Sequence, residues 1–216
     1  MNARDAILSR IRTQLAKAPE VARPEVPEVW PHTGAGKEKL IEQFTAELAA
    51  VGGECIRCAT VEEARDKLAH LAKEAEWESI GSFDHPDCRE VAAGLADENV
   101  VWATESWDPK QKADLSLGLV PADYLMADTG ACMVACASAE QRLLCYLPPA
   151  CVVVARAEQL REHMPHVWSE VAHRAADPEL RGEFVFITGP SRTADIEKIL
   201  IIGVHGPKRL VVLLIG

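Results

Sequence analysis

Helix-like and strand-like segments alternate along most of this 216-residue chain, and the alternation constrains its fold more than any other feature. Helical periodicity marks residues 35–53, 60–75 and 86–99, and short apolar runs mark residues 54–59, 78–83 and 100–104. Strands that are separated by helices pair in parallel, and a parallel sheet needs helices on both of its faces. The sequence therefore predicts a three-layer α/β domain, with Thr60 as the cap of its second helix.

The pattern changes after residue 124, where apolar runs follow one another with no room for helices between them. We expect hairpin-connected strands at residues 124–127, 131–137, 143–147 and 151–155. Beyond them the sequence predicts a helical region at 155–177 with a break at Pro165, a strand at 183–189, a short helix at 193–202 and a last strand at 209–215. The hairpins make the predicted sheet mixed, although mostly parallel.

The first 34 residues differ in composition from the rest. Residues 3–17 are amphipathic, with Ile7, Leu8, Ile11 and Leu15 on one helical stripe. A segment with prolines at positions 19, 24, 27 and 31 follows, and this density of proline favours an extended linker. We expect a helical arm and linker at 1–34 and an α/β domain at 35–216. The arm either folds back on this domain or docks on another subunit, including a second copy in a homo-oligomer.

Charge and hydropathy exclude several classes of function. The formal net charge is −10 and the basic residues form no long cluster, which argues against binding nucleic acid through its phosphates. No apolar run reaches the length of a membrane span, about 18 residues, and the N-terminus lacks the apolar core of a secretory signal. A cytoplasmic protein is expected.

The cysteines and histidines do not show metal-ligand spacing. Seven cysteines are an odd number, which favours reduced thiols over a disulfide framework. Cys55 and Cys58 form one C-x-x-C, but a short strand puts their thiols on opposite faces and no second pair exists. His163 and His166 are three residues apart, yet Pro165 interrupts the helix between them. The sequence predicts no metal site and no cofactor in this chain.

Polar residues gather first at Asp128, Thr129 and Gly130, where a predicted strand turns. Asp-Thr-Gly also occurs in aspartic proteases, but those enzymes need two such triplets and this chain has one. Two alternatives remain. The residues either form a turn for conformational reasons, or they face a ligand, with Gly130 allowing close approach of the backbone.

The second polar stretch is "TGPSRTAD" at 188–195, which we place between a strand and a helix. Helix N-terminal amides, two hydroxyls and a guanidinium suit an anion. Capping and the helix dipole explain Ser191, Asp195 and Glu197, but they do not explain Arg192, because the N-terminal dipole disfavours a cation. A turn containing His205 and Gly206 follows. The candidate ligand-binding residues are Thr129, Gly130, Gly189, Ser191, Arg192, Thr193, Asp195 and Gly206, and the candidate catalytic residues are Asp128 and His205.

Several motifs together resemble the LUD domain family, which includes lactate utilization protein C. These are "ADYLMADTGACMV", "LPPACVVVARAEQL" and, most specifically, "GPSRTADIEKILIIGVHGP". The resemblance implies a Rossmann-like α/β/α fold similar to the ribose-5-phosphate isomerase, glucosamine-6-phosphate deaminase and CoA-transferase group. It also implies a role beside iron–sulfur proteins in a complex that oxidises L-lactate to pyruvate, with the clusters on the partner subunits.

Three functions follow as hypotheses. In the first, the chain is a subunit of this lactate-oxidising system and binds a small carboxylate or other anion, with Arg192 pairing with the carboxylate and Asp128 or His205 handling protons. In the second, it is a non-catalytic assembly or regulatory subunit. In the third, it is a stand-alone isomerase-like or CoA-transferase-like enzyme that acts on a phosphorylated or CoA-linked substrate.

Overall fold

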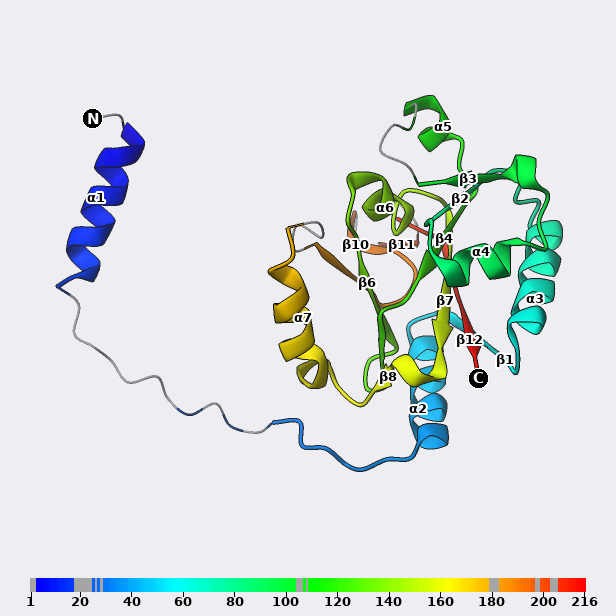
Figure 1. Ribbon diagram of the computed structural model, residues 1–216, viewed down its shortest axis with the longest axis horizontal. Helices are drawn as coiled ribbons and strands as arrows, with labels where there is room; N and C mark the ends of the chain where they lie inside the picture. The colour runs from blue at the N-terminus through cyan, green and yellow to red at the C-terminus, as the bar shows by residue number, and fades with distance from the viewer. Residues whose placement is uncertain are drawn as a thin grey trace. The chain divides into compact units, whose positions relative to one another are not determined.

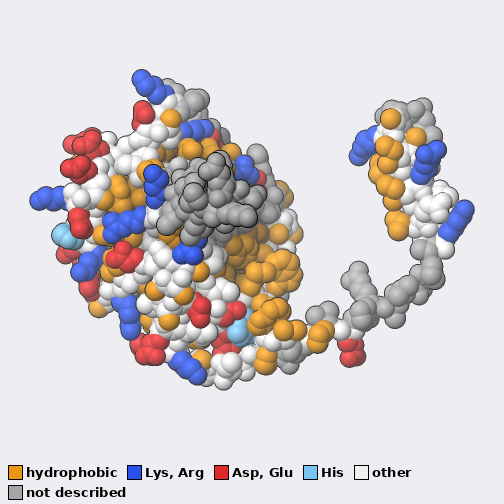
Figure 2. Space-filling model, turned by 180° about the vertical axis from the view of Figure 1, so that it is seen from behind, with side chains coloured by type: hydrophobic (Ala, Val, Ile, Leu, Met, Phe, Trp, Pro, Cys, Tyr) orange, Lys and Arg blue, Asp and Glu red, His pale blue; other side chains and the backbone are white. Residues whose placement is uncertain are grey.

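The computed structural model describes residues 3–17, 25, 27, 29–103, 107, 109–178, 183–196, 199–202 and 206–216. The chain divides into two units, Met1–Pro31 and His32–Gly216. The smaller unit contains α1 (Ala3–Leu15), the predicted helix of the arm. Figure 2 shows hydrophobic side chains along one side of this helix, in agreement with the predicted stripe.

A six-stranded sheet forms the centre of the larger unit (Figure 1). In spatial order its strands are β1 (Glu54–Cys58), β12 (Arg209–Ile215), β7 (Ala150–Arg156), β4 (Leu117–Pro121), β2 (Ile80–Ser82) and β3 (Val100–Trp102). Every neighbouring pair is parallel. The central strands β7 and β12 are rich in valine and leucine and are buried almost throughout, as expected for a parallel sheet that is covered on both faces. The predicted α/β fold with a mostly parallel sheet is confirmed.

Helices cover both faces of this sheet. The described helices of the larger unit are α2 (Lys37–Ala50), α3 (Val61–Glu74), α4 (Pro86–Ala92), α5 (Pro109–Ala113), α6 (Ala139–Leu144) and α7 (Trp168–Ala175), with short turns η1 (Asp97–Asn99), η2 (Ala157–Gln159) and η3 (Met164–Val167). Of these, α7 packs against β5 and β6 of a second sheet. On β2, the Ser82 side chain forms a hydrogen bond with the Cys88 side chain of α4, whereas Gly81 faces Leu144 of α6. Successive strand residues point to opposite faces, so α4 and α6 lie on opposite sides. Thr60 caps α3 as predicted and accepts a hydrogen bond from the Glu63 amide at 3.3 Å.

A second sheet has the order β8 (Leu160–Arg161), β5 (Tyr124–Met126), β6 (Ala131–Ala135) and β9 (Phe184–Ile187). The antiparallel pair β5 and β6 confirms the first predicted hairpin. The predicted strand at 143–147 was wrong, and the predicted strand at 151–155 is present but does not belong to a hairpin. Residues 143–147 overlap the end of α6, whose first turn is capped by Ser138, and residues 151–155 belong to the parallel strand β7. Apolar runs this short do not distinguish a strand from a buried helix.

The predicted helical region at 155–177 is only partly correct, because η2, β8 and η3 occupy its first half and α7 its end. Pro165 lies in the first turn of η3, where a proline fits because its missing amide has no partner there. The residue that we expected to break a helix therefore opens a helical turn.

The predicted helix at 193–202 is wrong. The chain forms an antiparallel hairpin of β10 (Arg192–Ile196) and β11 (Ile199–Ile202) instead. Four of the residues at 193–202 are isoleucines and one is a threonine, and β-branched residues favour strands over helices.

The location of the 188–207 stretch also differs from the prediction. Its preceding strand, β9, belongs to the second sheet, and the Ser191 amide donates to the carbonyl of Pro207, just before β12 begins. The stretch therefore reaches the amino ends of the main parallel strands. Parallel sheets of this type bind ligands at the carboxyl ends of their strands, so the stretch lies at the opposite edge of the main sheet.

The surface and the thiols agree with the sequence-based expectations. Figure 2 shows basic side chains scattered among acidic ones over the described part of one face. All seven cysteines are free, and burial raises the pKa of Cys58 to about 11 and that of Cys151 to about 12. Among the described helices, none combines the length and the apolar character that a membrane crossing requires.

Candidate functional site

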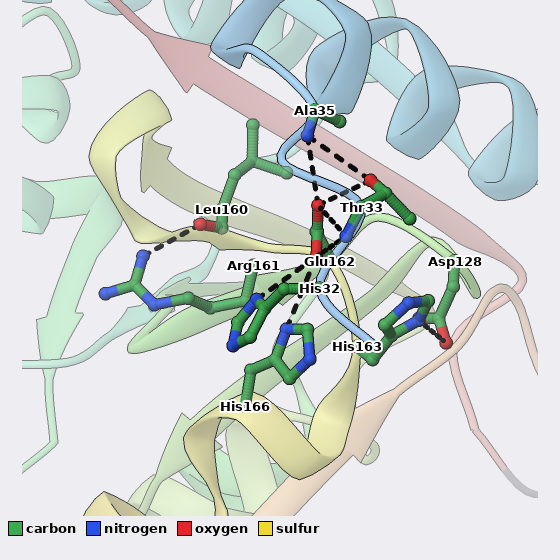
Figure 3. A network of polar contacts seen from close by, with 9 residues as sticks. All are labelled: His32, Thr33, Ala35, Asp128, Leu160, Arg161, Glu162, His163 and His166. Atoms are coloured by element: carbon green, nitrogen blue, oxygen red, sulfur yellow. Dashed lines mark hydrogen bonds and ion pairs between the residues drawn. The ribbon is translucent and has the colours of Figure 1, made fainter. Parts of the chain in front are cut away.

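Asp128, one of the two predicted catalytic residues, lies at the edge of a cluster of carboxylates and imidazoles that is centred on Glu162 (Figure 3). Asp128 follows β5, and the buried Glu162 follows β8. Because β5 and β8 are parallel neighbours, the two acids emerge at the same edge of the second sheet. The Asp128 amide donates to the backbone carbonyl of Glu162 at 3.2 Å, which fixes the two segments against each other.

Glu162 anchors the segment that precedes α2. The Thr33 hydroxyl donates to Oε1 of Glu162 at 2.6 Å, the Thr33 amide to Oε2 at 3.0 Å and the Ala35 amide to Oε1 at 3.2 Å. The hydrogen bond from the Thr33 side chain, helped by these amides, lowers the pKa of Glu162 to about 2. The side chain is therefore a fixed carboxylate at any physiological pH.

Two histidines turn toward the same carboxylate oxygen. Nδ1 of His32 lies 3.2 Å from Oε2 of Glu162, and Nδ1 of His166 lies 3.8 Å from it. The two imidazole rings stack with their centroids 3.5 Å apart. The His32 side chain is 74% exposed and that of His166 is 9% exposed, so the cluster reaches from the interior to solvent.

Asp128 pairs with a third histidine. Its Oδ2 lies 3.0 Å from Nδ1 of His163, and both side chains are mostly buried. An aspartate that holds Nδ1 of a histidine fixes the tautomer and stabilises the imidazolium, which leaves Nε2 to exchange a proton. Oδ1 of Asp128 is buried and has no hydrogen-bond partner in the described part of the chain. The Asp128–His163 dyad is therefore suited to general acid–base chemistry.

The rest of the first predicted loop has a structural explanation. Gly130 has φ +64°, and a Cβ there would lie 2.3 Å from the backbone nitrogen of Leu48 in α2. The group that approaches this glycine closely is thus a helix, which favours the conformational alternative for the turn. Thr129 is exposed, and its predicted role in ligand binding stays a prediction.

Arg192 also has a structural partner. Its Nη2 donates to the carbonyl of Val51 at 2.5 Å, where α2 ends. A cation is favourable at a helix C-terminus, so the residue that capping of its own segment could not explain stabilises the end of another helix. Gly189, with φ +93°, packs against Val51 as well. The prediction that helix N-terminal amides in this stretch bind an anion was wrong, because residues 192–196 form the strand β10 and not a helix.

The remaining predicted residues are described only in part. Gly206 lies against Ser191, where a Cβ would approach the Ser191 Cβ to 2.9 Å. The side chains of Thr193 and Asp195 and the whole of His205 lie outside the described residues. Both predicted loops reach the C-terminal half of α2, through Gly130 and Gly189. In the described part of the chain, Arg192 and the Asp128–His163 dyad share no hydrogen bond or ion pair.

Sequence reasoning missed Glu162, His163, His166 and His32 as site residues. The signal in the sequence for this cluster is the pair His163 and His166 on either side of Pro165, but the interpretation of Pro165 as a helix break separates the two histidines. His32 lies in the predicted linker, 130 residues before its partner Glu162, and no local pattern connects the two.

A cleft of about 540 Å³ lies at the carboxyl ends of β1, β7 and β12, and none of the predicted site residues lines it. Its basic residues are Arg65 and Arg156, and Arg156 is already paired with Asp87 and Glu90. The Asp128 cluster is therefore the stronger candidate.

Comparisons with known proteins agree with this architecture. A family model described as the LUD domain matches residues 41–215. Lactate utilization protein C of Bacillus pumilus is 28% identical, over 98% of this chain and 96% of that protein. Lactate utilization protein C of Halalkalibacterium halodurans is 26% identical, over 95% of this chain and 94% of that protein. The crystal structure of a DUF162 family protein from Deinococcus radiodurans matches with a TM-score of 0.62 and 17% identity, over 84% of this chain and 99% of that one, which shows the shared fold.

Proposed function

This chain belongs to the LUD domain family, and from that membership we propose that it works in lactate utilization. The observation that carries the proposal is similarity along nearly the whole length of two proteins named lactate utilization protein C. Similarity of this extent covers the arm, the linker and the α/β unit together, so it supports a shared role and not only a shared domain.

Within that role, the chain is a subunit of a system that oxidises L-lactate to pyruvate. This oxidation removes two electrons and two protons from a 2-hydroxy acid. The cysteines of this chain are predicted not to hold a cluster, so the electrons pass to iron–sulfur partner proteins. The chain contributes binding of the small carboxylate and proton transfer.

The dyad gives the proton transfer a location. Nε2 of His163 accepts the hydroxyl proton of the bound 2-hydroxy acid, and the Asp128 carboxylate, 3.0 Å from Nδ1, stabilises the resulting imidazolium. The Cα–H bond breaks as well: its two electrons pass to the partner proteins and its proton is released to water. Asp128 thus keeps the proton-handling role that the sequence suggested, but acts through His163. Both side chains are mostly buried, and partial exclusion of water strengthens the interaction between them.

A second candidate, from another class, is a non-catalytic assembly subunit. The observation that favours it is α1, which carries Ile7, Ile11 and Leu15 on one face and buries none of its residues. An isolated helix of this length is marginal in water, so a partner surface would stabilise it. Here the arm docks the iron–sulfur proteins and the α/β unit performs no chemistry.

Purification of the tagged full-length chain from its source tests both candidates. We expect iron–sulfur proteins to co-purify, and the preparation to reduce a dye when L-lactate is added. Removing residues 1–30 keeps His32 and Thr33, whose hydrogen bonds to Glu162 hold the start of the larger unit in place. That unit should therefore stay folded. Loss of the partners on this deletion supports docking by the arm. If the wild-type preparation contains neither iron nor lactate-dependent activity, the complex does not exist as proposed.

A further inference from the structure

Three metal-ligating side chains converge beside the dyad. They are His32, Glu162 and His166, and their potential ligand atoms all lie within 4.8 Å of one another. His32 precedes α2, whereas Glu162 and His166 lie on either side of the start of η3. Two distant segments thus meet to form one donor set, with two imidazoles and one carboxylate (Figure 3).

The distances match those between ligands of one small cation. Donor atoms at about 2.0–2.1 Å from a tetrahedral ion lie about 3.3 Å from one another. Oε2 of Glu162 is 3.2 Å from Nδ1 of His32 and 3.8 Å from Nδ1 of His166. The two imidazole rings stack at an interplanar angle of 24°, so both must rotate out of the stack before all three atoms, now within 4.8 Å of one another, can bond one ion.

The carboxylate is already held by a second set of contacts. Oε1 of Glu162 accepts from the Thr33 hydroxyl and the Ala35 amide, at 2.6 and 3.2 Å. These bonds orient the carboxylate so that Oε2, which also accepts from the Thr33 amide at 3.0 Å, lies toward the histidines, as outer contacts do in known metal sites. The site is also open on one side, because the His32 side chain is 74% exposed.

We propose that His32, Glu162 and His166 bind one divalent transition-metal ion, best matched by zinc, and leave a coordination position for water or an anionic ligand. Two imidazoles with one carboxylate suit zinc and its neighbours in the first transition row, whereas magnesium and calcium prefer oxygen ligands alone. The site is independent of the proposed role in lactate utilization, since the isolated chain would bind the ion.

Cobalt(II) titration of the full-length chain, stripped with a chelator, tests the proposal. Cobalt gives visible absorption bands whose intensity reports a four- or five-coordinate site, and zinc should displace it. We expect saturation at one equivalent. His32→Ala and His166→Ala should each weaken cobalt binding at least about tenfold, because each removes a ligand. The His32 side chain is exposed and Thr33 still binds Glu162 in this variant, so its replacement should leave the fold intact.

His70→Ala and His173→Ala are matched controls, since both histidines are exposed and lie on other helices, α3 and α7. Both should bind cobalt as the wild type does. A second readout is thermal unfolding: zinc should raise the melting temperature of the wild type and of the controls, but not that of His32→Ala. Failure of the wild type to bind one equivalent, or equal affinity in the wild type and both ligand variants, overturns the proposal.

Discussion

Gly130→Ala is expected to destabilise the folded chain by about 2–5 kcal/mol, from overpacking and from left-handed backbone strain together. The added Cβ would lie 2.3 Å from the backbone nitrogen of Leu48, and a helix backbone cannot move aside as a flexible side chain can. The residue also has φ +64°, which an L-residue with a side chain adopts at a cost. Urea unfolding followed by circular dichroism measures the change.

Gly34→Ala separates these two effects. Gly34 has φ +69°, nearly the same backbone conformation, but nothing lies within 4 Å of the position of its Cβ. Its substitution should therefore lower the free energy of unfolding only by the backbone strain of the left-handed conformation, about 1–2 kcal/mol. If Gly130→Ala lowers the free energy of unfolding no more than Gly34→Ala does, the 128–130 turn does not pack tightly on α2. A ligand-facing role for Gly130 then becomes the better explanation.

His163→Gln is expected to lower lactate-dependent activity of the purified complex by about 10²- to 10⁴-fold, the usual contribution of a general acid or base. Glutamine keeps a polar side chain of similar size but cannot accept the proton. Asp128→Asn should lower the activity as well, because an amide neither fixes the histidine tautomer nor stabilises the imidazolium. Dye reduction at saturating L-lactate measures both variants.

The control for this experiment is His173→Gln, on the exposed surface of α7. It should keep wild-type activity, and all three variants should keep the wild-type circular dichroism spectrum and the same iron–sulfur partners. Activity of His163→Gln and Asp128→Asn within twofold of the wild type would remove the dyad from the chemistry and favour the assembly role.

The α/β architecture could be predicted because its signals are local. The valine- and leucine-rich run at 209–215 forms a strand wherever it is buried, and Thr60 caps α3 through a residue three positions away. The errors fell on short segments. Residues 193–202 have both helical spacing and β-branched side chains, and pairing between β10 and β11 decided the outcome.

The candidate site could be predicted only in part, because its contacts are not local. Asp128 was identified from its turn, but its partner His163 lies 35 residues away. Arg192 was correctly identified as unusual for its own segment. Its partner, the carbonyl of Val51, lies 141 residues away at the end of another helix, and one sequence contains no signal for that pairing.

Growth of a strain that lacks this chain tests the role in lactate utilization most directly. We expect the strain to fail on L-lactate as the sole carbon source and to grow normally on pyruvate, because only the oxidation step would be lost. The wild-type chain should restore growth on lactate, and the His163→Gln chain should not. Normal growth of the deletion strain on L-lactate, in the absence of another lactate-oxidising enzyme, would contradict the proposed function.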